Sequence, residues 1–173
     1  MSDAIKILTL LIGQSELVTL EYWSEFILGF QRDNAVPNPT LQERFGSIRI
    51  PPFFRIRLRG KWWIGNRQKW EAAIRDFAYK GVAPVTLEGP LQASLMMTKL
   101  GSSVLAVNVN MQGDLTLDLS DGDTITVQGV GGGWDESWFL ELPLDDPDHD
   151  LWSIVCDSDA SISAKFPDSV RTG

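Results

Sequence analysis

Residues 99–129 read KLGSSVLAVNVNMQGDLTLDLSDGDTITVQG, and this stretch decides the fold class. Apolar and polar residues alternate over 107–109 and again over 115–119, which predicts two half-buried strands. Gln112-Gly113-Asp114 supplies a turn between them, and Asp121-Gly122 is a hairpin-turn dipeptide that leads to a further alternating run. The stretch therefore predicts a three-stranded antiparallel meander.

The N-terminal part of the chain repeats this pattern. Leu11-Ile12-Gly13 matches Lys99-Leu100-Gly101, and the alternating apolar residues within 18–30 match those within 107–119. The third strand of the meander, Thr124–Gly129, has its counterpart in Arg55–Gly60. We interpret the match as an internal duplication.

A short helix is expected before each matched glycine, over Asp3–Leu11 and over Pro90–Lys99. Proline suits the first turn of a helix, and glycine suits the position just past its end. The clearest helix is predicted over Asn66–Lys80, with Asn66 as its cap, one apolar stripe, and an end at Gly81.

The remaining segments complete the predicted architecture. The proline-rich segment 31–52 is expected to be a surface loop, and a hairpin is expected over 151–166. We predict an α+β fold of two related lobes of antiparallel strands, each with a helix, packed as one unit. The first lobe is predicted to span residues 1–88 and the second residues 89–173.

Composition indicates an intracellular globular protein. The chain has 173 residues and one cysteine, Cys156, so an intrachain disulfide is excluded. Cys156 lies in an apolar run, which favours a buried structural thiol. The first residues lack the charge pattern of a signal peptide, and no apolar stretch is long enough to span a bilayer. We therefore expect a soluble, cytoplasmic protein with no membrane association.

Charge is divided unevenly along the chain. Residues 44–80 carry ten basic and two acidic side chains, while residues 100–164 carry 13 acidic side chains and neither Lys nor Arg. Two interpretations remain open. The two segments could neutralise each other within the fold, or one of them could be a docking surface for a partner of opposite charge.

The acidic half holds the candidate partner-binding residues. Tryptophans flanked by carboxylates are typical of protein interfaces, where aromatic anchors sit inside a charged rim. The acidic loop that follows adds further carboxylates. The candidate residues are Trp134, Asp135, Glu136, Trp138, Asp145, Asp146, Asp148 and Asp150.

An alternative site is a nucleic-acid face in the basic segment. Basic residues interleaved with aromatic ones are typical of single-strand binding, through phosphate contacts and base stacking. The net charge of −8 disfavours nucleic acid as the partner. The candidate residues for this face are Arg55, Arg57, Arg59, Trp62 and Lys69.

No catalytic, cofactor or metal site is indicated. The glycine-rich run 129–133 precedes a strand-like segment, whereas a phosphate loop leads into a helix. His149 is the single histidine and lies among carboxylates, so a zinc site lacks ligands and a solvated loop is favoured over a calcium site. A pair of catalytic carboxylates remains an alternative that sequence spacing cannot identify.

Three short motifs give a resemblance to known families. Gly113-Asp114-Leu115-Thr116-Leu117, Asp121-Gly122 and Trp134-x-Glu136-Ser137-Trp138 resemble small bacterial families of uncharacterised proteins, including immunity proteins of polymorphic and contact-dependent toxin systems. The resemblance implies a bacterial cytosolic protein that acts by binding, and it identifies no site residues. We therefore expect a non-enzymatic inhibitor that docks a basic protein through its acidic half, with nucleic-acid binding or carboxylate-based catalysis as alternatives.

Overall fold

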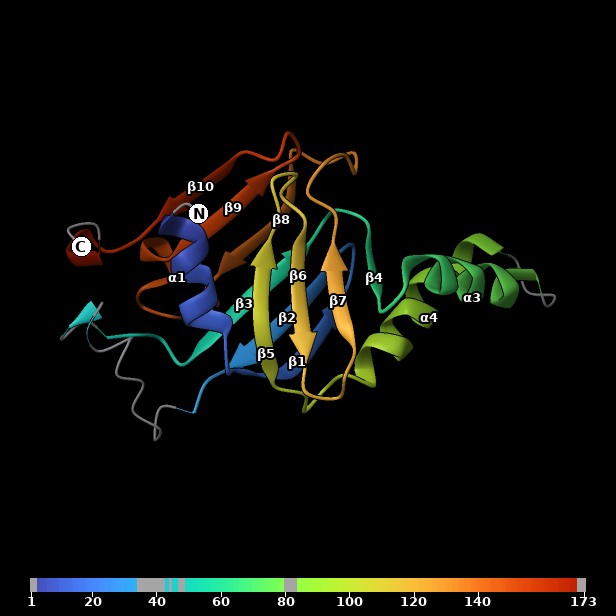
Figure 1. Ribbon diagram of the computed structural model, residues 1–173, viewed down its shortest axis with the longest axis horizontal. Coiled ribbons are helices and arrows are strands. Elements are labelled where there is room, and N and C mark those ends of the chain that lie inside the picture. Colours follow the sequence, from blue (N-terminus) through green and yellow to red (C-terminus); the bar gives the residue numbers. More distant parts are fainter. Residues whose placement is uncertain (1–2, 34–42, 44, 47–48, 80–83, 171–173) are drawn as a thin grey trace.

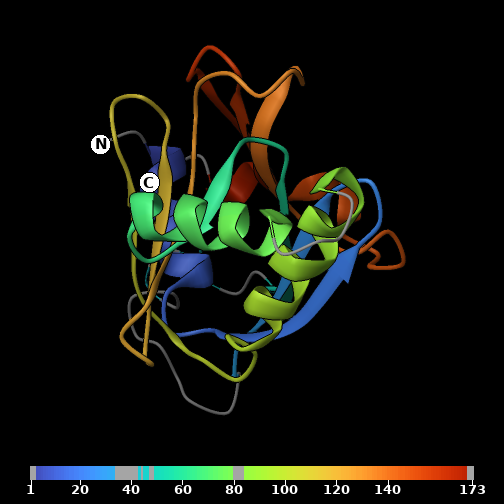
Figure 2. The same ribbon diagram turned by 90° about the vertical axis from the view of Figure 1, so that its right-hand side faces the viewer.

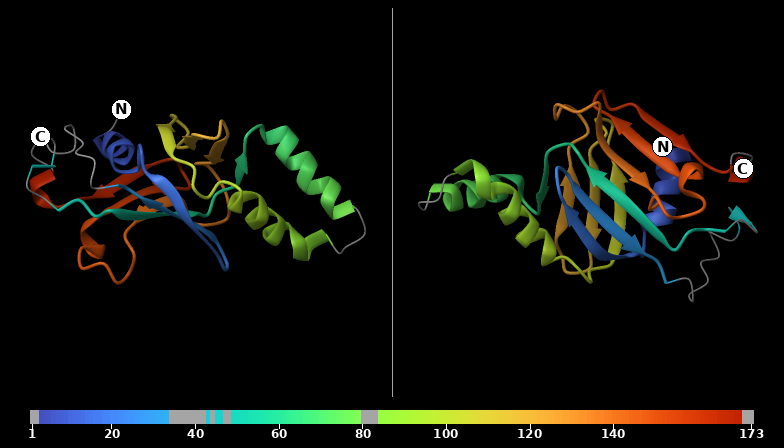
Figure 3. Two further views of the ribbon diagram at one scale, coloured as in Figure 1. Left: turned by 90° about the horizontal axis from the view of Figure 1, so that it is seen from below. Right: turned by 180° about the vertical axis from the view of Figure 1, so that it is seen from behind.

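The computed structural model describes residues 3–33, 43, 45–46, 49–79 and 84–170. The fold is α+β, as predicted, with two antiparallel sheets packed face to face (Figures 1 and 3). The six-stranded sheet has the order β1-β2-β3-β8-β9-β10, and the four-stranded sheet has the order β4-β7-β6-β5. The strands are β1 Glu16–Tyr22, β2 Phe26–Gln31, β3 Phe53–Leu58, β4 Trp62–Ile64, β5 Val104–Val109, β6 Leu115–Leu119, β7 Thr124–Val127, β8 Glu136–Glu141, β9 Ser153–Asp157 and β10 Ile162–Lys165.

Both predicted meanders are present, and each is extended by a strand from the other half of the chain. The meander β1-β2-β3 pairs with β8, and the meander β5-β6-β7 pairs with β4. The boundary at residue 88 therefore does not separate the two sheets. The sequence could not reveal this exchange, because alternation marks which segments are strands and says nothing about distant pairing.

The two matched segments contact each other through reciprocal hydrogen bonds. The Leu17 amide donates to the Ser102 carbonyl at 3.0 Å, and the Val104 amide donates to the Ser15 carbonyl at 2.8 Å. Likewise the Gln14 amide donates to Val104, and the Gly101 amide donates to Leu17, both at 2.8 Å. Both segments have the predicted order of helix end, strand, turn and strand.

The hydrophobic core lies between the two sheets. The inward residues of every strand in both meanders contribute, and Trp138 and Trp152 are among the largest fully buried side chains. Helix α1, Asp3–Ile12, closes the core beside β5, where it lies next to the inner face of the six-stranded sheet (Figure 1). Its last turn is held by Arg32, which donates hydrogen bonds to the carbonyls of Leu10 and Leu11.

Helices α3, Arg67–Tyr79, and α4, Pro84–Met97, form an arm beside the sheets (Figures 1 and 2). Asn66 caps α3 as predicted, because its Oδ1 accepts a hydrogen bond from the Lys69 amide at 3.0 Å. A row of aromatic rings fixes the arm to the sheets: Phe26 lies 4.7 Å from Trp62, and Trp62 lies 5.4 Å from Trp70. The predicted helix end at Gly81 and most of the proline-rich loop lie outside the described residues.

The predicted helix start at Pro90 is wrong. Helix α4 begins at Pro84 and ends at Met97, so Pro90 lies in its interior. An interior proline removes one backbone hydrogen bond from the helix. Helix α4 packs against α3 and β1. Two short 3₁₀ turns, His149–Leu151 and Asp168–Val170, lie in the C-terminal part of the chain. No helix in the described part of the chain is long and apolar enough to cross a membrane.

Candidate partner-binding surface

The structure separates the predicted partner-binding residues into two places. Trp134 and Asp135 precede β8, whereas the loop with Asp145 and Asp150 follows it, so the two groups lie at opposite ends of that strand. These four residues are exposed. The acidic loop and the tryptophan therefore do not form one continuous surface.

Four other predicted residues make contacts within the protein, and the burial of Trp138 contradicts its predicted role as an exposed anchor. Trp138 is fully buried, and its indole Nε1 donates a hydrogen bond to the Gly113 carbonyl at 2.7 Å. Glu136 forms an ion pair with Arg59. Asp146 and Asp148 both pair with Arg49, at 3.4 and 2.8 Å.

The predicted nucleic-acid face is not a free basic surface. Arg55 and Arg57 in β3 and Arg59 directly after it do share one face, but all three are half-buried and paired with carboxylates. Glu141 bridges Arg55 and Arg57 at 3.1 and 2.7 Å, and Glu25 bridges Arg57 and Arg59 at 2.5 and 2.8 Å. Glu21 completes this network at 3.7 Å from Arg55. The alternating arginines thus neutralise glutamates from both halves of the chain.

The last two residues of that predicted face lie elsewhere. Trp62 is buried, and its ring contacts Phe26 and Trp70 in the row that holds the arm. Lys69 is exposed on α3, outside the β3 face. The arginines of the predicted face are paired with carboxylates and Trp62 is buried. These residues therefore do not offer the free cations and exposed aromatic ring that single-strand binding requires.

Three loops that are distant in sequence meet at one end of the sheets and form what we call the apical surface. Its parts are residues 110–114, 129–135 and 157–161, which lie together at the top of Figure 1. The Ser158 amide donates to the Asp135 carbonyl at 2.8 Å, and the Gly129 amide donates to Asp114 Oδ1 at 2.8 Å. The buried Trp138 ties the first loop to β8 through its bond to Gly113. The loops are therefore joined to one another.

Large apolar side chains are exposed on the apical surface. Met111 is 100 % exposed, Trp134 is 49 % exposed, and Val130 is 44 % exposed. Backbone hydrogen bonds fix the loop that carries each of these residues, so their exposure is not explained by a disordered loop. Large exposed apolar residues on ordered, neighbouring loops are typical of interaction sites.

The same three loops also carry carboxylates. Asp135 and Asp159 are exposed, and Asp114 and Asp157 are half-buried nearby in the same loops. Hydrogen bonds from the Ser161 amide and side chain lower the pKa of Asp159, so its carboxylate is charged at neutral pH. Because residues 100–164 contain no Lys or Arg, the three loops supply no compensating cation.

The remaining chemical candidates do not assemble a catalytic centre. Cys156 is buried as predicted, and burial, with nearby carboxylates, raises the pKa of its thiol to about 11. A thiol that stays protonated is a poor nucleophile. The His149 ring nitrogen Nδ1 lies 2.8 Å from the Leu142 carbonyl. Within the described residues, no three His, Cys, Asp or Glu side chains gather as metal ligands.

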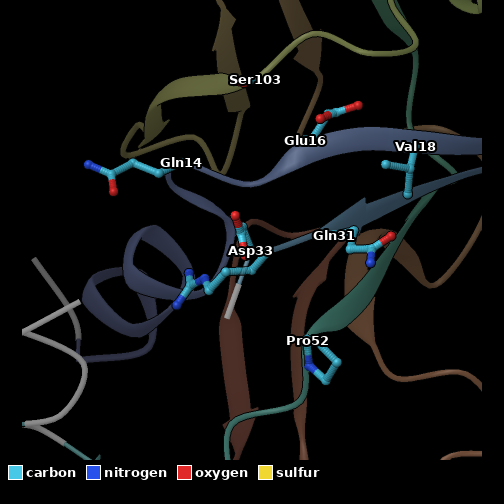
Figure 4. A pocket seen from close by; sticks show the side chains of 8 residues that line it. Gln14, Glu16, Val18, Gln31, Asp33, Pro52 and Ser103 are labelled. Carbon is cyan, nitrogen blue, oxygen red and sulfur yellow. The ribbon is translucent and has the colours of Figure 1, made fainter. Parts of the chain in front are cut away.

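One open cleft lies near the end of α1, with a volume of about 680 Å³. Glu16 and Asp33 line it, together with Gln14, Gln31 and the Arg32 side chain that caps α1. Figure 4 shows Gln14 and Gln31 pointing in opposite directions. Catalysis requires groups that converge on one reacting atom. The cleft therefore gives weaker support for an enzyme than the apical surface gives for a binding protein.

Comparison with known proteins gives no match: no protein-family model, no curated protein and no solved structure matches the chain.

Proposed function

We propose that this protein is a non-enzymatic binding protein that docks a basic protein partner on its apical surface. The observation that carries the proposal is the exposure of Met111 and Trp134 on hydrogen-bonded loops that also carry carboxylates and contain neither Lys nor Arg. Apolar anchors supply affinity in such an interface, and the carboxylates speed the encounter with a basic partner.

The partner class follows from the charge of the surface and from the sequence resemblance. An acidic surface favours a basic protein, and the resemblance to bacterial immunity proteins favours a toxin that the protein inhibits in the bacterial cytoplasm. Occlusion of the toxin's basic surface would be sufficient for inhibition. Nothing in this mechanism requires a reaction on the part of the inhibitor.

Selection from a random peptide library on the immobilised protein tests the proposal. We expect enrichment of peptides that combine Lys or Arg with apolar residues. Binding of the selected peptides should fall at least tenfold in Met111→Ser, because the substitution removes an apolar anchor. The variant should fold normally, since Met111 is fully exposed. Leu144→Ser is the matched control, since Leu144 is 75 % exposed in the acidic loop at the other end of β8.

Charge reversal tests the location of the surface. Asp135→Lys with Asp159→Lys should slow association at low salt, and the difference should shrink at high salt because salt screens exposed charges. Asp145→Lys with Asp150→Lys changes the net charge equally in the other acidic loop and should have a smaller effect. Equal effects of the two pairs, or peptides enriched without basic residues, would contradict the proposal.

A further inference from the structure

Among the exposed aromatic side chains that the structure describes, Trp134 lies against an arginine of its own chain. The Arg59 guanidinium carbon is 5.2 Å from the centre of the Trp134 ring and 4.8 Å from the centre of the Phe139 ring. The Arg59 guanidinium thus contacts both aromatic rings. The contact with Arg59 restricts the Trp134 indole already in the free protein, so the side chain would lose less conformational entropy on binding.

The charge of Arg59 is compensated inside the protein. Its Nε donates to Glu25 Oε2 at 2.8 Å, and its Nη1 pairs with Glu136. A bare arginine under the ring would repel a second cation on the opposite face. Two carboxylates bonded to that arginine largely cancel the repulsion, so the π-face keeps its attraction for a cation.

About half of the Trp134 residue is accessible to solvent. The residue is 49 % exposed although Arg59 covers one side. Its sequence neighbour Asp135 is also exposed, and no Lys or Arg lies within residues 100–164. A cation placed over the free side of the ring would therefore meet both an aromatic face and a nearby carboxylate.

We infer that Trp134 is a cation–π platform that receives an arginine side chain of the partner on the ring face opposite Arg59. The inference rests on the proposed function and makes it more specific, because it states which side chain of the partner binds and which ring of this protein it contacts. The complete arrangement is a stack of partner arginine, Trp134, Arg59 and Phe139, with Glu25 and Glu136 neutralising the inner arginine.

Nuclear magnetic resonance titration of the ¹⁵N-labelled protein with a tetra-arginine peptide tests the inference. The Trp134 indole signal can be assigned from its loss in Trp134→Phe. We expect that signal and the Asp135 and Asp159 amides to shift during the titration. A tetra-citrulline peptide, which is uncharged and similar in shape, should leave them unchanged.

Affinity for tetra-arginine should fall about threefold in Trp134→Leu and less in Trp134→Phe, as expected for an exposed cation–π contact. Trp23→Leu is the matched control: Trp23 is 82 % exposed in the β1–β2 turn, and we expect its substitution to leave the affinity unchanged. Circular dichroism confirms that each variant is folded.

The outcomes separate this inference from the proposed function. Shifts at Met111 and Asp159 with unchanged affinity in Trp134→Leu would overturn the platform and leave the apical surface standing. Equal binding of the citrulline peptide would also overturn the platform, because stacking without charge would then explain the contact. Absence of shifts throughout the apical surface would overturn both.

Discussion

Helix α1 and helix α4 each lead into a three-stranded meander, yet they are buried to different extents. We call residues 3–58 the α1 unit and residues 84–127 the α4 unit. In α1, five of ten residues are buried, including Leu8 and Ile12. In α4, Met96 is the buried residue among the side chains that the structure describes. The sequence match places Met96 at the position of Leu8, so the two helices share one anchor and differ elsewhere.

The strands beyond each meander explain this difference. The six-stranded sheet continues from β8 into β9 and β10, which gives α1 a wide surface to cover. The four-stranded sheet ends at β4, where the chain turns into α3, and α4 packs on α3 and β1 instead. The same pattern of helix and meander thus gives a core helix in one unit and an arm in the other. The difference depends on the element that follows the exchanged strand: β9 follows β8, and helix α3 follows β4.

The largest expected effect of the comparison is at the residue just before each matched glycine. Ile12 is fully buried, while Leu100, its counterpart in the repeat, is 37 % exposed. Ile12→Ala should lower the free energy of unfolding by about 4 kcal/mol through lost burial and a cavity, and Leu100→Ala by less than about 1 kcal/mol. Urea unfolding measures both values. Equal losses would show that the two matched positions are buried alike.

A smaller effect is expected where the chain crosses between the sheets. A methyl group on Gly60 would lie 2.3 Å from the Gln128 carbonyl oxygen, and one on Gly129 would lie 2.2 Å from the Gly113 carbonyl carbon. Because backbone atoms cannot move aside cheaply, Gly60→Ala and Gly129→Ala should each cost about 2–3 kcal/mol. Thermal unfolding compares them, with Ser94→Ala on the exposed side of α4 as control. A tolerated change at one glycine alone would show that the two crossings are not equivalent.

The sequence predicted local features well and distant pairing poorly. Alternation identified both meanders, and Asn66 identified the start of α3, because each signal acts within a few residues. The exchange of β4 and β8 depends on contacts between the two halves, for which no local pattern exists. The arginines of β3 were predicted to share a face, and they do. Their partners could not be assigned, since a chain with 23 acidic residues offers many equivalent choices.

The tryptophans of the candidate site show the same limit. Trp134 and Trp138 are an even number of residues apart, so a continuous strand would place both on one face. The pairing of β8 with β9 instead shifts register between Glu136 and Trp138, and Trp134 lies in the loop before β8. One ring is therefore exposed and the other is buried. A register shift depends on the partner strand, which the local sequence does not specify.

The smallest expected effect concerns the ionic contacts of the two units and depends on pH. Burial raises the pKa of the Glu25 carboxyl, but hydrogen bonds from Arg59 and Arg57, with their positive charges, outweigh burial and lower it below 4.5. A lowered pKa in the folded state means that the stabilisation is present above pH 4.5 and is lost as the pH falls through the folded value. Glu25→Gln should therefore cost about 1 kcal/mol at neutral pH and progressively less in acid.

In the α4 unit an ion pair joins Lys99 and Asp121, at 2.8 Å. The hydrogen bond from Lys99 lowers the pKa of Asp121, so the sign of the pH dependence is the same. The Asp121 side chain is 32 % exposed, against 12 % for Glu25, and water screens the exposed pair more strongly. Asp121→Asn should thus cost less than Glu25→Gln, under about 0.5 kcal/mol at neutral pH. Urea unfolding of both variants at pH 7 and at pH 3.5 gives the comparison. A Glu25→Gln cost that stays constant between these two pH values would mean that the bridging carboxylate is not what stabilises the arginines of β3.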